Sequence, residues 1–346
     1  MIFVGDIAIP FKEAFNIEDI PERLRLQNWF GNMEGALVNA VKENRTKRVV
    51  YNDFAAIEYL LEQLNFIGFA LANNHFFDID NLSETIRFLA HRQVGFVGAG
   101  ENIEAAQKPL ILEEEDQQIV ILNFGWEVIQ CKIADAKAGV NPLIKSHVID
   151  SVDQALTKYP NSHIVPFMHW GYELEGAPQP FERELAKHLI DLGVSGVIGT
   201  HSHRVGGIEF HRGKPIVYSL GNWLFKQGYY HGGKINFPKF CNSQLAFEWN
   251  FGTNEHKLHF FTYQKTESKL LYTKTLVADK DSFMHMAPYT KMDKHEYAKW
   301  YQRNHYHKGK GLPIYLWDDS KLEVDVKNFI NLIRDQMVAL YSRIRT

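Results

Sequence analysis

Short apolar runs alternate with amphipathic segments of helical period over most of the first 225 residues. The runs have the length of buried strands, and the segments between them have the 3.6-residue spacing of helices that cover a sheet. The predicted strands are Ile2–Val4, Phe66–Ala70, Gly95–Val97, Ile119–Phe124, His163–Met168 and Val194–Ile198. The predicted helices span residues 53–64, 83–92, 151–158 and 181–192. This alternation predicts a layered α/β fold.

Two further segments predict antiparallel hairpins at the edges or ends of a sheet. Leu110–Glu114 is followed closely by Gln118–Asn123. Gln244–Asn250 is followed by His256–Tyr263 across a turn that contains Gly252. We therefore expect antiparallel strands beside the parallel core.

The character of the chain changes near residue 266, where strand-like runs become few. We expect a main domain over residues 1–265 and a C-terminal extension over residues 266–346 that ends in a helix. One face of that helix is apolar, and its residues are Val326, Phe329, Ile330, Ile333, Met337, Leu340 and Ile344. Such a face predicts that the helix packs on the main domain.

Composition excludes several classes of function. A net charge of −3 provides no basic surface for nucleic acid. The two cysteines, Cys131 and Cys241, lack the spacing of a disulfide framework or a thiolate zinc site. No run approaches the roughly 20 apolar residues of a membrane span, and the apolar N-terminus contains Asp6 and lacks a basic leader. We expect a cytoplasmic protein without a membrane span.

Polar residues of metal-binding type directly follow four predicted strands. They are Asp6, the Asn73-Asn74-His75 triplet, His169, and the pair His201 and His203. The carboxyl ends of strands in a layered α/β fold converge on one crevice, so these residues should meet in space. Glu34 is a further candidate, because two divalent cations require carboxylates as well as imidazoles.

Each of these residues also has an ordinary explanation. Asp6 and Asn74 suit turns, and spaced histidine pairs arise by chance, as at His305 and His307. The repeated placement at strand ends favours the metal site over a random scatter. Gly98-Ala99-Gly100 lacks the third glycine of a dinucleotide fingerprint, and the sequence contains no Walker lysine, G-x-S-x-G or H-E-x-x-H motif.

Seven short motifs together resemble the capsule-synthesis CapA family, also called the poly-gamma-glutamate capsule proteins. This family is a branch of the calcineurin-like metallophosphoesterase fold. The resemblance runs from about Ile2 to Phe225. Its motifs, in order along the chain, are Gly5-Asp6, NMEG at 32–35, ANNHFFD at 72–78, GAG at 98–100 with a later proline, HWGYE at 169–173, GTHSH at 199–203 and YSLGNW at 218–223.

The resemblance implies an αββα sandwich and a set of metal ligands. These ligands are Asp6, Glu34, Asn74, His169, His201 and His203. His75 is then the imidazole beside the reacting group, and Asp78 orients it. Arg204, Trp170 and Glu173 are candidate contacts for an anionic substrate.

The sequence departs from the ordinary metallophosphoesterase pattern at several positions. Ala8 stands where the first motif normally has histidine, and Asn32-Met33-Glu34 replaces a segment that normally carries aspartate. Ser202 replaces the proline that is common in the family. One of the two metal positions is therefore expected to be weaker or filled differently.

We expect a hydrolase that uses two divalent transition metals, Mn, Fe or Zn, to activate water. The family's name implies an anionic ester or amide in capsule or exopolymer metabolism. The alternative is a non-catalytic factor that binds the polymer together with a capsule-synthesis partner protein. A TIM-barrel amidohydrolase is rejected, because its His-x-His pair follows the first strand, where this chain has Gly5-Asp6.

Overall fold

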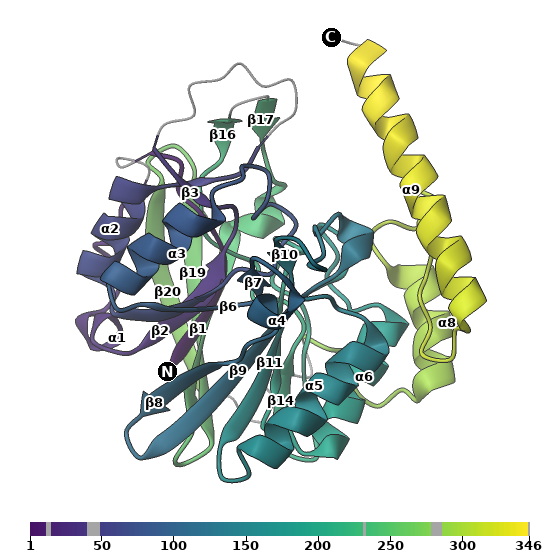
Figure 1. The fold of residues 1–346 in the computed structure, drawn as a ribbon, viewed down its shortest axis with the longest axis horizontal. Helices are drawn as coiled ribbons and strands as arrows, with labels where there is room; N and C mark the ends of the chain where they lie inside the picture. The colour runs from purple at the N-terminus through teal and green to yellow at the C-terminus, as the bar shows by residue number, and fades with distance from the viewer. Residues whose placement is uncertain (12–14, 40–48, 231–232, 278–285, 345–346) are drawn as a thin grey trace.

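Two β-sheets face each other, and helices cover the outer face of each in the computed structural model (Figure 1). The structure describes residues 1–11, 15–39, 49–230, 233–277 and 286–344, with side chains up to residue 337 apart from that of Tyr229. This four-layer αββα arrangement with a C-terminal helical appendage confirms the predicted fold class.

The first sheet has β1 at its centre, where it pairs in parallel with β2 and β15 and antiparallel with β18. Its strand order is β20 (Lys269–Val277), β19 (Glu255–Gln264), β18 (Ser243–Asn250), β1 (Ile2–Ala8), β2 (Trp29–Met33), β5 (Phe66–Ala70) and β6 (Gly95–Val97), with β15 (Asn222–Phe225) beside β1. The outer face of this sheet is covered by α2 (Phe54–Gln63) and α3 (Leu82–His91) (Figure 1).

The second sheet has a parallel centre and antiparallel edges. Its order is β13 (Ile208–His211), β14 (Lys214–Val217), β12 (Val197–Thr200), β11 (His163–His169), β9 (Gln117–Gly125) and β8 (Leu110–Glu114). It is covered by α5 (Lys145–Lys158) and α6 (Pro180–Leu192).

Short elements connect these layers. They are α1 (Glu22–Arg25), β3 (Leu37–Val38), β4 (Asn52–Asp53), β7 (Ala99–Gly100), α4 (Ile103–Ala106), η1 (Glu127–Ile129), β10 (Gly139–Val140), β16 (Gly228–Tyr230), β17 (Gly233–Ile235) and η2 (Lys239–Asn242). The chain then ends in α8 (Lys294–Asn304) and α9 (Lys321–Ile344).

Aromatic side chains fill the space between the two sheets. Phe30 of β2 contacts Phe3 of β1 with ring centroids 5.9 Å apart, and Phe167 of the opposite sheet at 5.3 Å. The neighbouring residues Ile2 and Val4 belong to the core on the helix-covered side. β1 is therefore buried on both faces, as expected for a central strand.

Most predicted elements are confirmed, and both predicted hairpins form. Three expectations were wrong in detail. β12 begins at Val197 instead of Val194, and α5 begins at Lys145 instead of Ser151. β20 is a nine-residue strand paired with β19 beyond residue 266, where few strands were expected.

The C-terminal segment docks on the main domain through a buried arginine. Arg183 of α6 makes a bidentate ion pair with Glu209 at 2.8 and 2.9 Å, and also donates to the carbonyl oxygens of Tyr289 and Met292. The apolar face predicted to pack on the main domain is instead exposed at Val326, Phe329, Ile330, Ile333 and Met337. The side chains of Leu340 and Ile344, predicted for the same face, lie outside the described residues.

Among the described residues, no helix combines the length and the apolar character needed to cross a membrane.

Candidate metal centre

The end of β1 lies tightly against the turn that precedes β15. The amide of Asp6 donates to the carbonyl oxygen of Gly221 at 3.0 Å. A Cβ atom at Gly5 would lie 1.8 Å from that same oxygen, so only glycine allows this approach. The Gly5-Asp6 motif therefore brings the first carboxylate beside the turn that carries Asn222.

Asp6, Glu34 and His203 form a buried cluster. Asp6 lies inside β1, which continues to Ala8 and does not end before Asp6 as predicted, while Glu34 follows β2 and His203 follows β12. One ligand atom from each residue lies within 4.8 Å of the other two, and the three side chains are at most 3% exposed. His203 Nδ1 lies 3.2 Å from Asp6 Oδ2, and His203 Nε2 lies 3.8 Å from Glu34 Oε1. Two carboxylates and an imidazole are a donor set that suits a divalent transition metal.

Glu34 is the residue of this cluster that protein contacts explain least. It is fully buried, yet neither carboxylate oxygen has a hydrogen-bond partner among the described residues. Burial, followed by the charge of Asp6, raises the pKa of Glu34 well above its usual value. A buried carboxylate without partners is costly unless a cation compensates for it, so Glu34 fits a metal site.

A second group of donors adjoins the first. His169 Nε2 lies 2.8 Å from Asn74 Oδ1 and 3.2 Å from His201 Nδ1. The backbone amide of His201 lies 3.2 Å from Asp6 Oδ2, which places this group beside the carboxylate of the first. Polar side chains from segments that are distant in sequence therefore lie beside one another.

The three histidines have different charge preferences. Burial and the neighbouring imidazoles lower the pKa values of His169 and His201 well below the usual range. Burial alone would also lower the pKa of His203, but the charges of Glu34 and Asp6 raise it to about 9. His169 and His201 are therefore held neutral, in the form that binds metals.

His75 and Asp78 form a pair at the edge of the cluster. His75 Nδ1 lies 2.6 Å from Asp78 Oδ2, and the same oxygen accepts from the amide of Val50 at 3.0 Å. The other ring nitrogen, His75 Nε2, lies 3.8 Å from Glu34 Oε1. Asp78 thus orients the imidazole so that Nε2 faces the cluster.

Four residues orient the candidate ligands, and of these only Asn73 was named among the polar residues of metal-binding type predicted from the sequence. Asn32 donates to Asp6 Oδ1 at 2.9 Å, and Asn73 donates to Asn32 Oδ1 at 3.1 Å. Thr200 Oγ1 lies 3.0 Å from His169 Nδ1, and Asn222 Oδ1 lies 2.9 Å from His203 Nδ1. All four lie in or beside the quoted motifs, but only their contacts reveal this role.

The loop after β12 holds its histidines in an unusual backbone conformation. His201 has φ +93° and His203 has φ +56°, a region that residues other than glycine seldom occupy. Such strain persists where the surrounding structure fixes it, typically at functional sites. The hydrogen bond from the amide of His201 to Asp6 is one such constraint.

The three predicted substrate contacts occupy different positions. Trp170 is 2% exposed and donates from Nε1 to the carbonyl oxygen of Tyr218, so it supports the loop from inside. Glu173 is exposed, and its charge acts on the pKa values of both Glu34 and His203. The guanidinium of Arg204 lies 4.7 Å from the ring of Phe240 at the surface.

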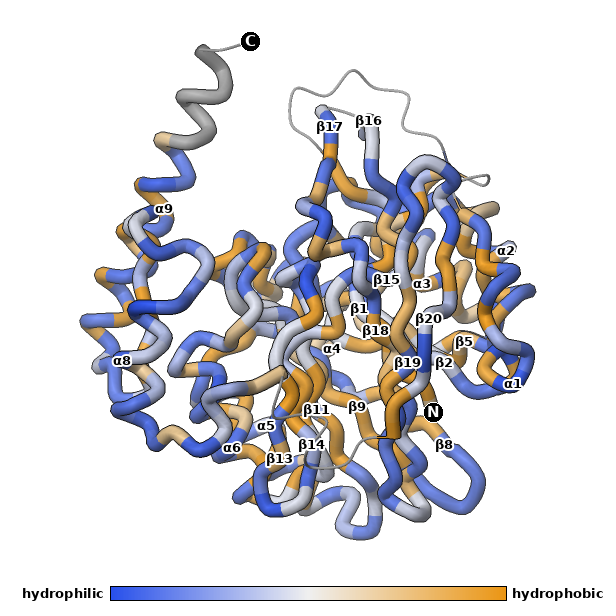
Figure 2. The backbone as a smooth tube through the Cα atoms, turned by 180° about the vertical axis from the view of Figure 1, so that it is seen from behind, coloured by the Kyte–Doolittle hydropathy of each residue, from blue (hydrophilic) through white to orange (hydrophobic). Residues whose placement is uncertain are grey.

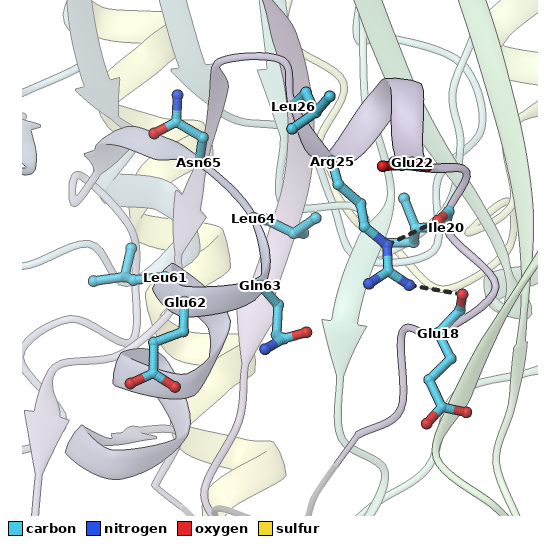
Figure 3. A pocket seen from close by; sticks show the side chains of 10 residues that line it. All are labelled: Glu18, Ile20, Glu22, Arg25, Leu26, Leu61, Glu62, Gln63, Leu64 and Asn65. Carbon is cyan, nitrogen blue, oxygen red and sulfur yellow. Dashed lines mark hydrogen bonds between the residues drawn. The ribbon is translucent and has the colours of Figure 1, made fainter.

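A shallow cavity of about 810 Å³ lies elsewhere, between α1 and the end of α2 (Figure 3). The side chain of Arg25 lines the cavity and donates to the carbonyl oxygens of Ile20 and Glu18. No residue of the metal cluster lines it. The buried cluster, and not this cavity, is therefore the candidate functional site.

Comparison with known families assigns the chain to a family. A family model described as "Bacterial capsule synthesis protein PGA_cap" matches residues 22–227. This chain belongs to the PGA_cap family. The matched region contains every candidate ligand of the cluster except Asp6, which precedes it.

Curated relatives of this PGA_cap protein carry related names. The chain is 30% identical over 175 residues to the "PGA biosynthesis protein CapA" of Bacillus subtilis, covering 49% of this chain and 45% of that protein. It is 27% identical to the "Capsule biosynthesis protein CapA" of Bacillus anthracis, covering 58% and 50%. The chain thus spans about half the length of these curated relatives.

Solved structures are more distant. A hypothetical protein from Thermus thermophilus has a TM-score of 0.42 at 14% identity, with 80% of this chain and 98% of that chain covered. A putative 5'-nucleotidase from Staphylococcus aureus has a TM-score of 0.38 at 10% identity, with 84% and 58% covered. Similarity at this level says nothing about the chemistry of the site.

Proposed function

We propose that this PGA_cap protein is a metal-dependent hydrolase that acts on an anionic ester or amide in capsule or exopolymer metabolism. The observation that carries the proposal is the unpartnered carboxylate of Glu34, buried beside Asp6 and His203. The names of the two CapA relatives support the link to capsule synthesis.

Two donor groups would hold the metals. Asp6, Glu34 and His203 form one group, and Asn74, His169 and His201 form the other, with Asp6 next to both. When bound, divalent cations would lower the pKa of a water molecule to near 7 and polarise the substrate. Asn32, Thr200 and Asn222 keep the ligand side chains in place.

His75 is the proton donor of the proposed reaction. Its Nδ1 is held by Asp78, so Nε2 carries the exchangeable proton on the side that faces Glu34. Protonation of the leaving group by a positioned imidazole typically contributes 10²- to 10⁴-fold to a rate.

Arg204 is the proposed contact for the anionic part of the substrate. It follows His203 directly, and its guanidinium lies over the ring of Phe240, which is 37% exposed. Phe237 of the same segment contacts the ring of His203 with centroids 4.5 Å apart. The segment from Phe237 to Phe240 therefore extends from the buried cluster to the guanidinium of Arg204.

The experiment is a hydrolysis screen of the manganese-loaded protein, with an aryl phosphate, an aryl ester and poly-γ-glutamate as substrates. Turnover that His203→Ala removes supports the hydrolase. The rival function is a non-catalytic polymer-binding factor, which the absence of a ligand at Ala8 favours. Polymer binding that survives His203→Ala, together with no turnover of any substrate, would establish that rival instead.

A further inference from the structure

Helix α9 exposes its apolar face and docks through its polar one. Asn331 is 4% exposed and donates to the hydroxyl oxygens of Tyr172 and Tyr315 at 3.1 and 3.0 Å. Asp335 accepts from Gln130 at 3.0 Å. These two polar residues anchor the helix to the rest of the protein.

The opposite side of α9 carries a stripe of large apolar side chains. Leu322, Val326, Phe329, Ile333 and Met337 are between 41% and 73% exposed. Seven of the fifteen large exposed apolar side chains among the described residues lie on this one helix. Figure 1 shows α9 at one side of the molecule, away from the two sheets, and Figure 2 shows apolar positions repeating along the part of the helix that is coloured by hydropathy. Apolar patches of this kind mark interaction surfaces.

The spacing of this stripe is symmetric about its centre. Along the line through Ile333, the sequence places apolar residues at 322, 326, 329, 333, 337, 340 and 344, so the intervals are 4, 3, 4, 4, 3 and 4; Ile330, which is 44% exposed, lies beside this line. This is an 11-residue repeat, for which the apolar seam of a nearly straight helix stays on one side. Reversing the direction of the helix about Ile333 reproduces the same pattern.

We propose that α9 pairs antiparallel with α9 of a second copy of this chain. Centred on Ile333, the pairing sets Phe329 of one copy against Met337 of the other. Every position of the seam then faces an apolar residue. A twofold axis at Ile333 makes the contact closed and self-complementary, the commonest arrangement of protein dimers.

Charge at the edge of the stripe agrees with the same pairing. Asp325 and Arg343 are 18 residues apart, which is five helical turns, so their backbone positions lie on one side of α9. An antiparallel partner brings Asp325 of one copy beside Arg343 of the other, and symmetry repeats the pair. Parallel pairing would set each of these residues beside its own copy. Opposite charges flanking an apolar seam determine partner and orientation.

The first test is the mass of the protein in solution by light scattering over a concentration series. The wild type is expected to be a dimer of the 40.1 kDa chain. Ile333→Asp should weaken dimerisation by more than about tenfold, because it buries a charge in the seam. Leu332→Asp is the matched control, since Leu332 is 55% exposed but lies off the stripe and the dimer should persist. A wild type that is monomeric throughout, or a dimer that Ile333→Asp leaves intact, overturns the proposal.

The second test distinguishes orientation and occupant. In the presence of oxidised glutathione, Phe329→Cys mixed with Met337→Cys should give a disulfide between the two variants faster than either variant alone, and the native Cys131 and Cys241 are buried. Equal rates in all three samples overturn the antiparallel pairing. Monomeric wild type that floats with lipid vesicles also overturns the proposal, because the occupant is then a membrane surface. Neither test depends on hydrolytic activity, so the proposed function can fail independently.

Discussion

Glu34 Oε1 lies 3.8 Å from His203 Nε2 in a buried cluster, and the carboxylate of Glu34 has no hydrogen-bond partner among the described residues. A side chain so placed destabilises the metal-free protein and stabilises the metal-loaded one. Because the effect of Glu34 on stability differs between the metal-free and metal-loaded protein, the site can be tested by stability measurements as well as by activity.

Replacing Glu34→Gln should stabilise the metal-free protein. The raised pKa of Glu34 means that the folded state binds a proton more tightly than the unfolded state, so stability is lost as pH rises above about 4.5. Removing the carboxylate should raise the free energy of unfolding by about 1–3 kcal/mol at pH 8, and by less at pH 5. Urea unfolding in a chelator measures this, with the exposed Glu62→Gln as a control that should change nothing.

Replacing His75→Asn should separate catalysis from metal binding. His75 lies beside the cluster but contacts Asp78, so its loss should lower turnover by about 10²- to 10⁴-fold while the metal content stays at the wild-type level. Turnover and elemental analysis on the same sample decide this. Loss of metal together with activity would make His75 a ligand instead.

Replacing Arg183→Met should destabilise the fold. It leaves Glu209, which is 2% exposed, without its ionic partner and removes hydrogen bonds to the C-terminal segment. Breaking a buried pair in this way costs about 3–5 kcal/mol, measurable by urea unfolding. Arg212→Met, which breaks an exposed ion pair with Asp191, should cost less than about 1 kcal/mol. Equal losses of unfolding free energy in the two variants would contradict the stabilising role of the buried Arg183–Glu209 pair.

The Glu248–His259 pair should make stability depend on acid pH. The hydrogen bond from His259 lowers the pKa of Glu248 to about 2. A lowered carboxyl pKa contributes stability that is present above the unfolded value near 4.5 and is lost as pH falls towards 2. Because solvent screens this partly exposed pair, the wild type should lose about 1–2 kcal/mol more than Glu248→Gln between pH 5 and pH 2. An equal loss of unfolding free energy in the two proteins between pH 5 and pH 2 would show that the pair does not stabilise the fold.

The sequence predicted the position of the site better than its details. Asp6 lies inside β1, His169 is the last residue of β11 and His203 follows β12. The carboxyl ends of parallel strands converge regardless of distance along the chain, but the exact place of each residue in its strand was not predicted. Asn32 and Thr200 were not assigned, because a residue inside a strand gives no sign of which neighbour its side chain will contact. Their roles depend on strand order, which periodicity does not encode.

Three elements were missed or misplaced in the sequence analysis, and each has its own physical reason. β2 contains Gly31 and Asn32 in a buried strand, so its apolar run is interrupted. β20 is an edge strand rich in lysine and threonine, which lacks a strong apolar pattern. α5 begins after Ile144 without a side-chain cap, so no start signal precedes it. The apolar stripe of α9 was recognised, but periodicity does not reveal whether a face packs within the chain or outside it.

The central claim is that residues near the carboxyl ends of separate strands bind metals together. The most direct measurement is the number of Mn²⁺ ions retained per chain after desalting, by elemental analysis of the wild type, His203→Ala and His169→Ala. The account predicts two ions in the wild type and a loss in each variant. No retained metal in the wild type, or unchanged metal in both variants, would contradict it.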